Sequence, residues 1–78
     1  MKTTAENLVA QWLGSATERV LSVKQAVWLS DLIVGEGIGT PVDTLLRRQY
    51  FHIEARHYFL CFRQNGSAIL RPHSQEAK

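Results

Sequence analysis

The sequence has little from which a covalent or metal-bound scaffold could be built. Cys61 is its single cysteine, so no disulfide can form within these 78 residues. No pair of cysteines or histidines has the spacing of a structural zinc site. The longest apolar run, residues 26–34, is interrupted by Ser30 and Asp31, and it is far shorter than the roughly 18 residues of a membrane span. The N-terminus, MKTTAENL, has no apolar signal core after its lysine. We therefore expect a cytoplasmic protein without metal, cofactor or membrane partner.

Length and composition predict a small globular unit. Hydrophobic residues make up 45% of the chain and charged residues 21%, which is the balance of a folded domain. A chain this short closes one apolar core, so residues 1–72 are predicted to form a single compact α+β domain. Residues 73–78 are predicted to be a disordered tail. Because small domains without disulfides or metals often gain stability from a second subunit, we also expect self-association.

Charge is distributed unevenly along the chain. Residues 1–46 carry a net charge of −2 and residues 47–78 a net charge of +4, and five of the six basic residues in the second part are arginines. The planar guanidinium of arginine binds carboxylate and phosphate groups through paired donors, which lysine cannot do. An arginine-rich C-terminal part therefore indicates an anionic partner.

Capping signals place two helices in the first half. Thr3 and Glu6 have the spacing of a capping box, and Gly14 is suited to a left-handed C-cap, which predicts a helix over residues 4–13. Ser22 and Gln25 repeat the capping spacing, and a helix over residues 23–34 is predicted to end at Gly35. The broad apolar stripe of this second helix is expected to face the core, and it consists of Val23, Ala26, Val27, Ile33 and Val34. Two large apolar residues fall away from that stripe, Trp28 and Leu32, and we expect them to form a patch for self-association or for a partner.

A third helix is predicted over residues 40–48, because Thr40 is a good N-cap and Pro41 suits the first helical position. Aromatic and β-branched residues follow, and residues 50–54 are expected to form a strand. The alternative is that the third helix continues through Tyr50 and Ile53.

Asn65-Gly66 is the strongest local signal in the sequence, and it predicts a two-residue turn joining strands over residues 58–64 and 67–72. Such a turn places Arg63 opposite Ala68 and Cys61 opposite Leu70. One face of the hairpin would then carry Tyr58, Leu60, Phe62 and Ile69, and the other Phe59, Cys61, Ala68 and Leu70. The expected fold is three helices packed on a small antiparallel sheet made of this hairpin and the additional strand.

Motifs of catalysis are weak. His52, Glu54 and His57 lack the i, i+4 histidine spacing of zinc proteases. In a strand, Cys61 and His57 would be about 13 Å apart, which is too far for direct proton transfer. The glycines between residues 35 and 39 follow a helix rather than a strand, so we interpret them as a flexible connection and not as a phosphate loop. We expect a binding protein and not an enzyme.

Arginine and aromatic residues interleave in the C-terminal part, as they do on surfaces that contact phosphates and stack bases. The predicted binding residues are Arg47, Arg48, Tyr50, His52, Arg56, Tyr58, Arg63 and Arg71. The expected partner is a nucleic acid or a protein complex that handles nucleic acid, and a regulator or inhibitor carried by a phage or mobile element fits this size and style by analogy. The alternative is a winged-helix DNA-binding regulator, with residues 40–48 as recognition helix and residues 64–67 as the tip of the wing.

Overall fold

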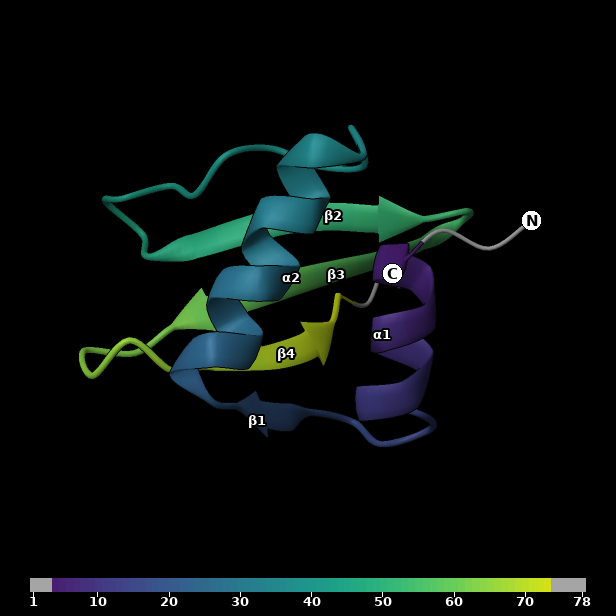
Figure 1. Ribbon diagram of the computed structural model, residues 1–78, viewed down its shortest axis with the longest axis horizontal. Coiled ribbons are helices and arrows are strands. Elements are labelled where there is room, and N and C mark those ends of the chain that lie inside the picture. Colours follow the sequence, from purple (N-terminus) through teal and green to yellow (C-terminus); the bar gives the residue numbers. More distant parts are fainter. Residues whose placement is uncertain (1–3, 74–78) are drawn as a thin grey trace, which may run out of the picture.

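The computed structural model describes residues 4–73 and shows two helices on one face of a four-stranded sheet (Figure 1). The elements in chain order are α1 (Thr4–Trp12), β1 (Arg19–Leu21), α2 (Val23–Gly35), β2 (Arg48–Ile53), β3 (Arg56–Phe62) and β4 (Ala68–Pro72). The sheet is antiparallel with strand order β1-β4-β3-β2. The α+β class is confirmed, whereas the prediction of three helices and two or three strands is wrong. Residues 1–3, with the predicted cap at Thr3, and the tail beyond His73 lie outside the described residues.

Both helices begin and end close to their predicted bounds. The capping box of α2 is present: the Ser22 hydroxyl accepts from the Gln25 amide at 3.2 Å, and the Gln25 side chain accepts from the Ser22 amide at 3.0 Å. Gly14 has the predicted left-handed backbone, with φ of 57°. α2 ends at Gly35, as predicted, and the left-handed residue beyond it is Gly37, with φ of 69°. The Gly37 and Ile38 amides then donate to the carbonyls of Val34 and Ile33, which closes the helix end.

The core-facing side of α2 matches the predicted stripe only at Ala26 and Ile33. Ala26, Leu29 and Ile33 are buried against the sheet, whereas the side chains of Val23, Val27 and Val34 are about half exposed. The buried residues recur at i, i+3 and i+7, which is the period of one helix face. The prediction failed because valines on both sides of α2 made the apolar stripe look wider than the face that is buried.

Residues 40–47 form a loop and a turn instead of the predicted third helix. The Asp43 carboxylate accepts from the amides of Leu45 and Leu46 at 3.0 and 3.1 Å, and its backbone pairs with Arg48. These local bonds compete with helical bonding. A helix here would also bury little apolar surface, since Leu45 is 89% exposed. Residues 38–40 pair with β2 instead: the Thr40 amide donates a hydrogen bond to the Tyr50 carbonyl at 3.0 Å, and the His52 amide donates to the Ile38 carbonyl at 2.9 Å.

The β3–β4 hairpin is present, but its register is shifted by one residue. Phe62 lies opposite Ala68 and Cys61 opposite Ile69. The backbones of Arg63 and Ser67 are hydrogen-bonded, and the three residues between them form the turn. Of these three, only Gly66 has positive φ, at 92°. This is a type I turn followed by a left-handed glycine. The Asn65 side chain accepts from the Ser67 amide and hydroxyl, which stabilises this wider turn. Because a one-residue slip exchanges faces, Ala68 and Leu70, and not Ile69, share the face of Leu60.

The remaining strands include one that was not predicted. β2 begins two residues before the strand predicted over residues 50–54 and ends one residue before its end, so the helical alternative for this segment is wrong. β1 is only three residues long, which is too short for the alternation of a strand to be seen between two helices.

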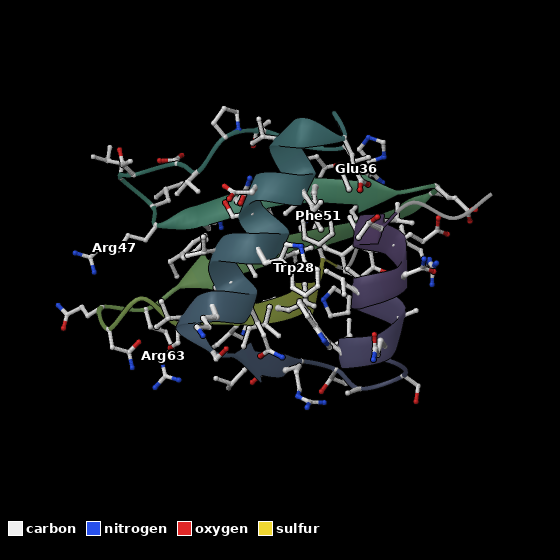
Figure 2. All side chains as sticks on the ribbon, viewed as in Figure 1. Trp28, Glu36, Arg47, Phe51 and Arg63 are labelled. Carbon is white, nitrogen blue, oxygen red and sulfur yellow. The ribbon has the colours of Figure 1, made fainter. Side chains whose placement is uncertain are left out.

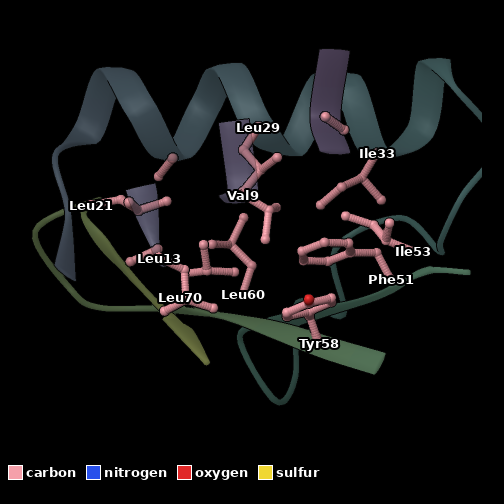
Figure 3. Close-up of a cluster of buried hydrophobic side chains, with 13 residues drawn as sticks. Val9, Leu13, Leu21, Leu29, Ile33, Phe51, Ile53, Tyr58, Leu60 and Leu70 are labelled. Atoms are coloured by element: carbon pink, nitrogen blue, oxygen red, sulfur yellow. The ribbon is translucent and has the colours of Figure 1, made fainter. Parts of the chain in front are cut away.

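The core lies between the helices and one face of the sheet (Figure 3). Phe51 and Tyr58 stack there with ring centroids 5.1 Å apart, α1 contributes Val9, and Leu13 is added from the turn that follows α1. One polar side chain is completely buried: Gln49 donates to the Thr40 carbonyl at 2.9 Å and ties the loop after α2 to β2. Burial of this face leaves the opposite face of the sheet without a covering helix in residues 4–73.

Candidate nucleic-acid interface

The uncovered side of the sheet is the candidate site, and we call it the open face. Side chains alternate between the two faces of a strand, so the residues between the buried ones in each strand point away from the helices. The open face consists of Val20, Arg48, Tyr50, His52, His57, Phe59, Cys61, Ile69 and Arg71. His73, which follows β4 and donates its amide to the His57 carbonyl, continues it.

Aromatic rings form a contiguous layer over β2 and β3. Tyr50 lies directly opposite Phe59 in the β2–β3 pairing, and their ring centroids are 5.8 Å apart in an edge-to-face arrangement. The Tyr50 ring stacks on His57 at 5.8 Å, and its hydroxyl is hydrogen-bonded to His57 Nδ1. His73 packs its edge against Phe59 at 4.9 Å. The contacts fix the rings in place, so the aromatic layer is preorganised.

Two arginines of the open face differ in their surroundings. The Arg48 guanidinium lies over the Phe59 ring, 4.5 Å from its centroid, which is a cation–π contact. Arg71 forms a salt bridge to Glu18 at 2.9 Å, with both side chains about half exposed. Arg48 is therefore available to an anionic or aromatic ligand, whereas Arg71 is partly neutralised by a neighbouring carboxylate.

Arg47 and Arg63 extend from one end of the molecule (Figure 2). Arg47 belongs to the turn before β2, and its carbonyl accepts from the Phe62 amide at 2.8 Å, which joins that turn to the end of β3. Arg63 follows β3 in the hairpin turn. Both are exposed, so this end of the sheet adds two cations beside Arg48.

Four of the eight predicted binding residues lie outside the open face: Arg47 and Arg63 at the end of the sheet, and Tyr58 and Arg56 on the helix side. Tyr58 is 5% exposed and stacks on Phe51 inside the core. Arg56 is exposed, but it lines a cleft of about 220 Å³ between α1 and the β2–β3 turn, together with Glu6 and Glu54. Both occupy strand positions whose neighbours two residues along are buried, which places them on the helix side.

The two residues predicted to form a self-association patch, Trp28 and Leu32, also differ in exposure. Trp28 is 51% exposed and packs edge-on against Trp12 of α1, with ring centroids 5.9 Å apart. Leu32 is half-buried against the core. Of the two, Trp28 is the residue that the structure presents to solvent.

Sequence reasoning left Phe59, His57 and His73 out of the site. The signal that identifies them is the alternation of β3: Tyr58, Leu60 and Phe62 form the more apolar set, so the set containing His57 and Phe59 should face solvent. His73 was assigned to the tail, although its backbone extends the pairing of β4.

Reactive side chains on this surface include Cys61 and three histidines, His52, His57 and His73. Cys61 and His57 share the open face but are four residues apart along β3, about 13 Å in an extended strand. Within residues 4–73, no group of three or more histidine, cysteine, aspartate or glutamate side chains is arranged to hold a metal ion. Neither helix of this part of the chain is long and apolar enough to cross a bilayer.

Comparison with known proteins adds no assignment: a scan against protein-family models, a search of the curated proteins and a search of the solved structures each found no match. The function is therefore argued from the open face itself.

Proposed function

We propose that this protein binds single-stranded nucleic acid on the open face and acts by binding rather than by catalysis. The observation that supports this best is the pairing of Tyr50 and Phe59 on adjacent strands, with the Arg48 guanidinium over the Phe59 ring. Sheets of RNA-binding domains stack unpaired bases on aromatic side chains, and arginine planes stack in the same way. One base would stack on Tyr50 and its neighbour on the outer plane of Arg48.

Phosphate contacts would come from the edge of this surface. Arg47 and Arg63 extend from the end of the sheet where Arg48 begins β2, so a strand that crosses the face meets three cations there. Guanidinium groups bind phosphate through paired donors. A duplex would not expose its bases to the rings, which is why the proposal specifies a single strand.

The winged-helix alternative is not proposed. It required a recognition helix over residues 40–48, and this segment is a loop and a turn that pairs with β2. The hairpin that was to serve as the wing is part of a four-stranded sheet.

The test is fluorescence anisotropy with labelled single strands of about eight nucleotides, of DNA and of RNA, at 50 and 200 mM salt. Tyr50→Ala should weaken binding about 5- to 150-fold, because one stacked base contributes about 1–3 kcal/mol. Phe59→Ala should weaken binding as well, because it removes the ring on which the Arg48 guanidinium lies. Tyr50→Phe and Phe59→Tyr keep the rings and should bind nearly as well as the unmodified protein.

Arginine variants provide a matched control. Arg48→Ala, on the open face, should weaken binding, and adding Arg47→Ala should reduce the slope of log K against log salt by about 0.7 for each lost phosphate contact. Arg56→Ala removes an exposed arginine from the helix side and should change neither the affinity nor the salt slope. Circular dichroism checks that each variant is folded. No binding of either strand at 50 mM salt, or equal effects of Arg48→Ala and Arg56→Ala, would refute the proposal.

A further inference from the structure

The outward side of α2 carries an exposed set of residues that the proposed function does not use. Side chains advance by about 100° per residue around a helix, and the buried Ala26, Leu29 and Ile33 define the core direction. Lys24 and Asp31 point in the opposite direction. Val27 and Trp28 flank them on either side, and they are 52% and 51% exposed. Figure 2 shows Trp28 on α2, on the helix side of the molecule.

These four residues are arranged symmetrically about the point midway between Val27 and Trp28. Lys24 precedes that point by three and a half residues, and Asp31 follows it by the same interval. A twofold axis through the point would lay α2 antiparallel to α2 of a second copy. Lys24 would then face Asp31 of the second copy. Because the twofold axis keeps each flank of the helix on its own side, Val27 would lie against Val27 and Trp28 against Trp28 of the second copy. The surface is thus complementary to itself in both charge and apolar contact, as a twofold interface requires.

The two charges have no role within the monomer that would explain their positions. Among residues 4–73, the salt bridge that forms joins Arg71 and Glu18 and involves neither Lys24 nor Asp31. Both also oppose the helix dipole. The first turn of α2 has no acidic residue and its last turn no basic one, while Lys24 lies near the positive N-terminus and Asp31 nearer the negative C-terminus. Each charge would be better placed at the other position if only the monomer were concerned.

We infer that α2 is a self-association surface, on which a second copy of this chain packs antiparallel with reciprocal Lys24–Asp31 contacts. The 13 residues of α2 make a helix about 20 Å long. One helix pair of this length with a tryptophan at its centre falls at the small end of specific interfaces, where complexes are weak and transient. Association is therefore expected at micromolar and not at nanomolar concentration.

Sedimentation equilibrium over a range on the order of 1–200 µM tests the inference, with three proteins: the unmodified chain, Lys24→Glu and Asp31→Lys. The average mass of the unmodified chain should rise with concentration toward twice the monomer mass. Each variant alone should associate at least tenfold more weakly, because like charges then face each other across the twofold axis. An equimolar mixture of the two variants should recover the association, since every contact between them is complementary.

The melting temperature separates this effect from unfolding. Lys24→Glu and Asp31→Lys both improve the match to the helix dipole, so the monomeric variants should melt no lower than the unmodified protein. Trp28→Ala should also weaken association, and Arg56→Glu, a charge reversal in the cleft beside α1 that no residue of α2 lines, should leave it unchanged. A single monomer mass at all concentrations, or a mixture that associates no better than its components, would overturn the inference. The outcome is independent of the open face, because α2 lies on the other side of the sheet (Figure 1).

Discussion

The three glycines of residues 35–39, at the end of α2 and just beyond it, should respond to alanine in three different ways. Gly35 ends α2, and a Cβ there meets nothing within 4 Å. Gly37 also has open space, but its φ is +69°. At Gly39 a Cβ would lie 2.2 Å from the Tyr50 carbonyl oxygen and 2.7 Å from the Phe51 Cα. Those atoms belong to the backbone of β2 and cannot move aside as a flexible side chain would.

The magnitudes follow from these surroundings. Gly35→Ala should stabilise by about 0.4–1 kcal/mol, through the lower entropy of the unfolded chain. Gly37→Ala should cost about 1–2 kcal/mol for an alanine in the left-handed region. Gly39→Ala must separate residues 38–40 from β2. It would thereby weaken the backbone bonds from His52 to Ile38, at 2.9 Å, and from Thr40 to Tyr50, at 3.0 Å. At about 0.5–1.5 kcal/mol for each bond, with disturbed packing of Phe51 added, the cost should be about 2–4 kcal/mol.

Thermal denaturation followed by circular dichroism measures all three variants. In a domain of this size 1 kcal/mol shifts the midpoint by roughly 4–8 °C. The midpoint should therefore rise slightly for Gly35→Ala, fall by about 4–16 °C for Gly37→Ala and fall further for Gly39→Ala. If Gly39→Ala were as stable as Gly37→Ala, the close pairing of residues 38–40 with β2 would be refuted, and the flexible connection expected from the sequence would be the better description.

Two further predictions concern the sheet. Gly66→Val should lower the free energy of unfolding by about 1–3 kcal/mol, because φ at this position is +92°; an unchanged urea midpoint would contradict the turn geometry. Glu18→Gln removes the carboxylate that pairs with Arg71 at 2.9 Å. It should cost at most about 1 kcal/mol of stability, while binding of single strands tightens and the salt slope steepens by about 0.7. Weaker binding of this variant would show that Arg71 does not face the ligand.

Local signals in the sequence were reliable where a single interaction decides the structure. The Ser22–Gln25 capping box and the Gly14 cap fix helix ends through bonds between near neighbours, and both are present. The β3–β4 hairpin was also recognised from its turn residues. Its register was not, because Asn-Gly also fits a wider turn in which Asn65 keeps negative φ and bonds to Ser67. One residue of difference in the turn reverses the faces of β4.

Tertiary choices were harder to predict. Thr40 and Pro41 are a good helix start, yet pairing with β2 and the Asp43 side-chain bonds determine the conformation of this segment. β1 is a strand only because it pairs with β4 at the edge of the sheet. The arginine and aromatic composition of the site was visible in the sequence, but its geometry was not, since it depends on which side of the sheet the helices cover. That choice buries Tyr58 and leaves Phe59 on the open face.

The two proposed surfaces lie on opposite sides of one sheet, and this arrangement constrains how they would work together. A twofold dimer through α2 would point the two open faces away from each other, so both would remain accessible. A short strand could then contact only one face, and association should leave its affinity for each subunit unchanged. A strand long enough to pass around the dimer could engage both faces, and its affinity would rise through effective concentration without any new contact. Comparing short and long strands with the unmodified chain and with Lys24→Glu separates the two effects. The length dependence should be lost in the variant, whereas the affinity for the short strand should not change.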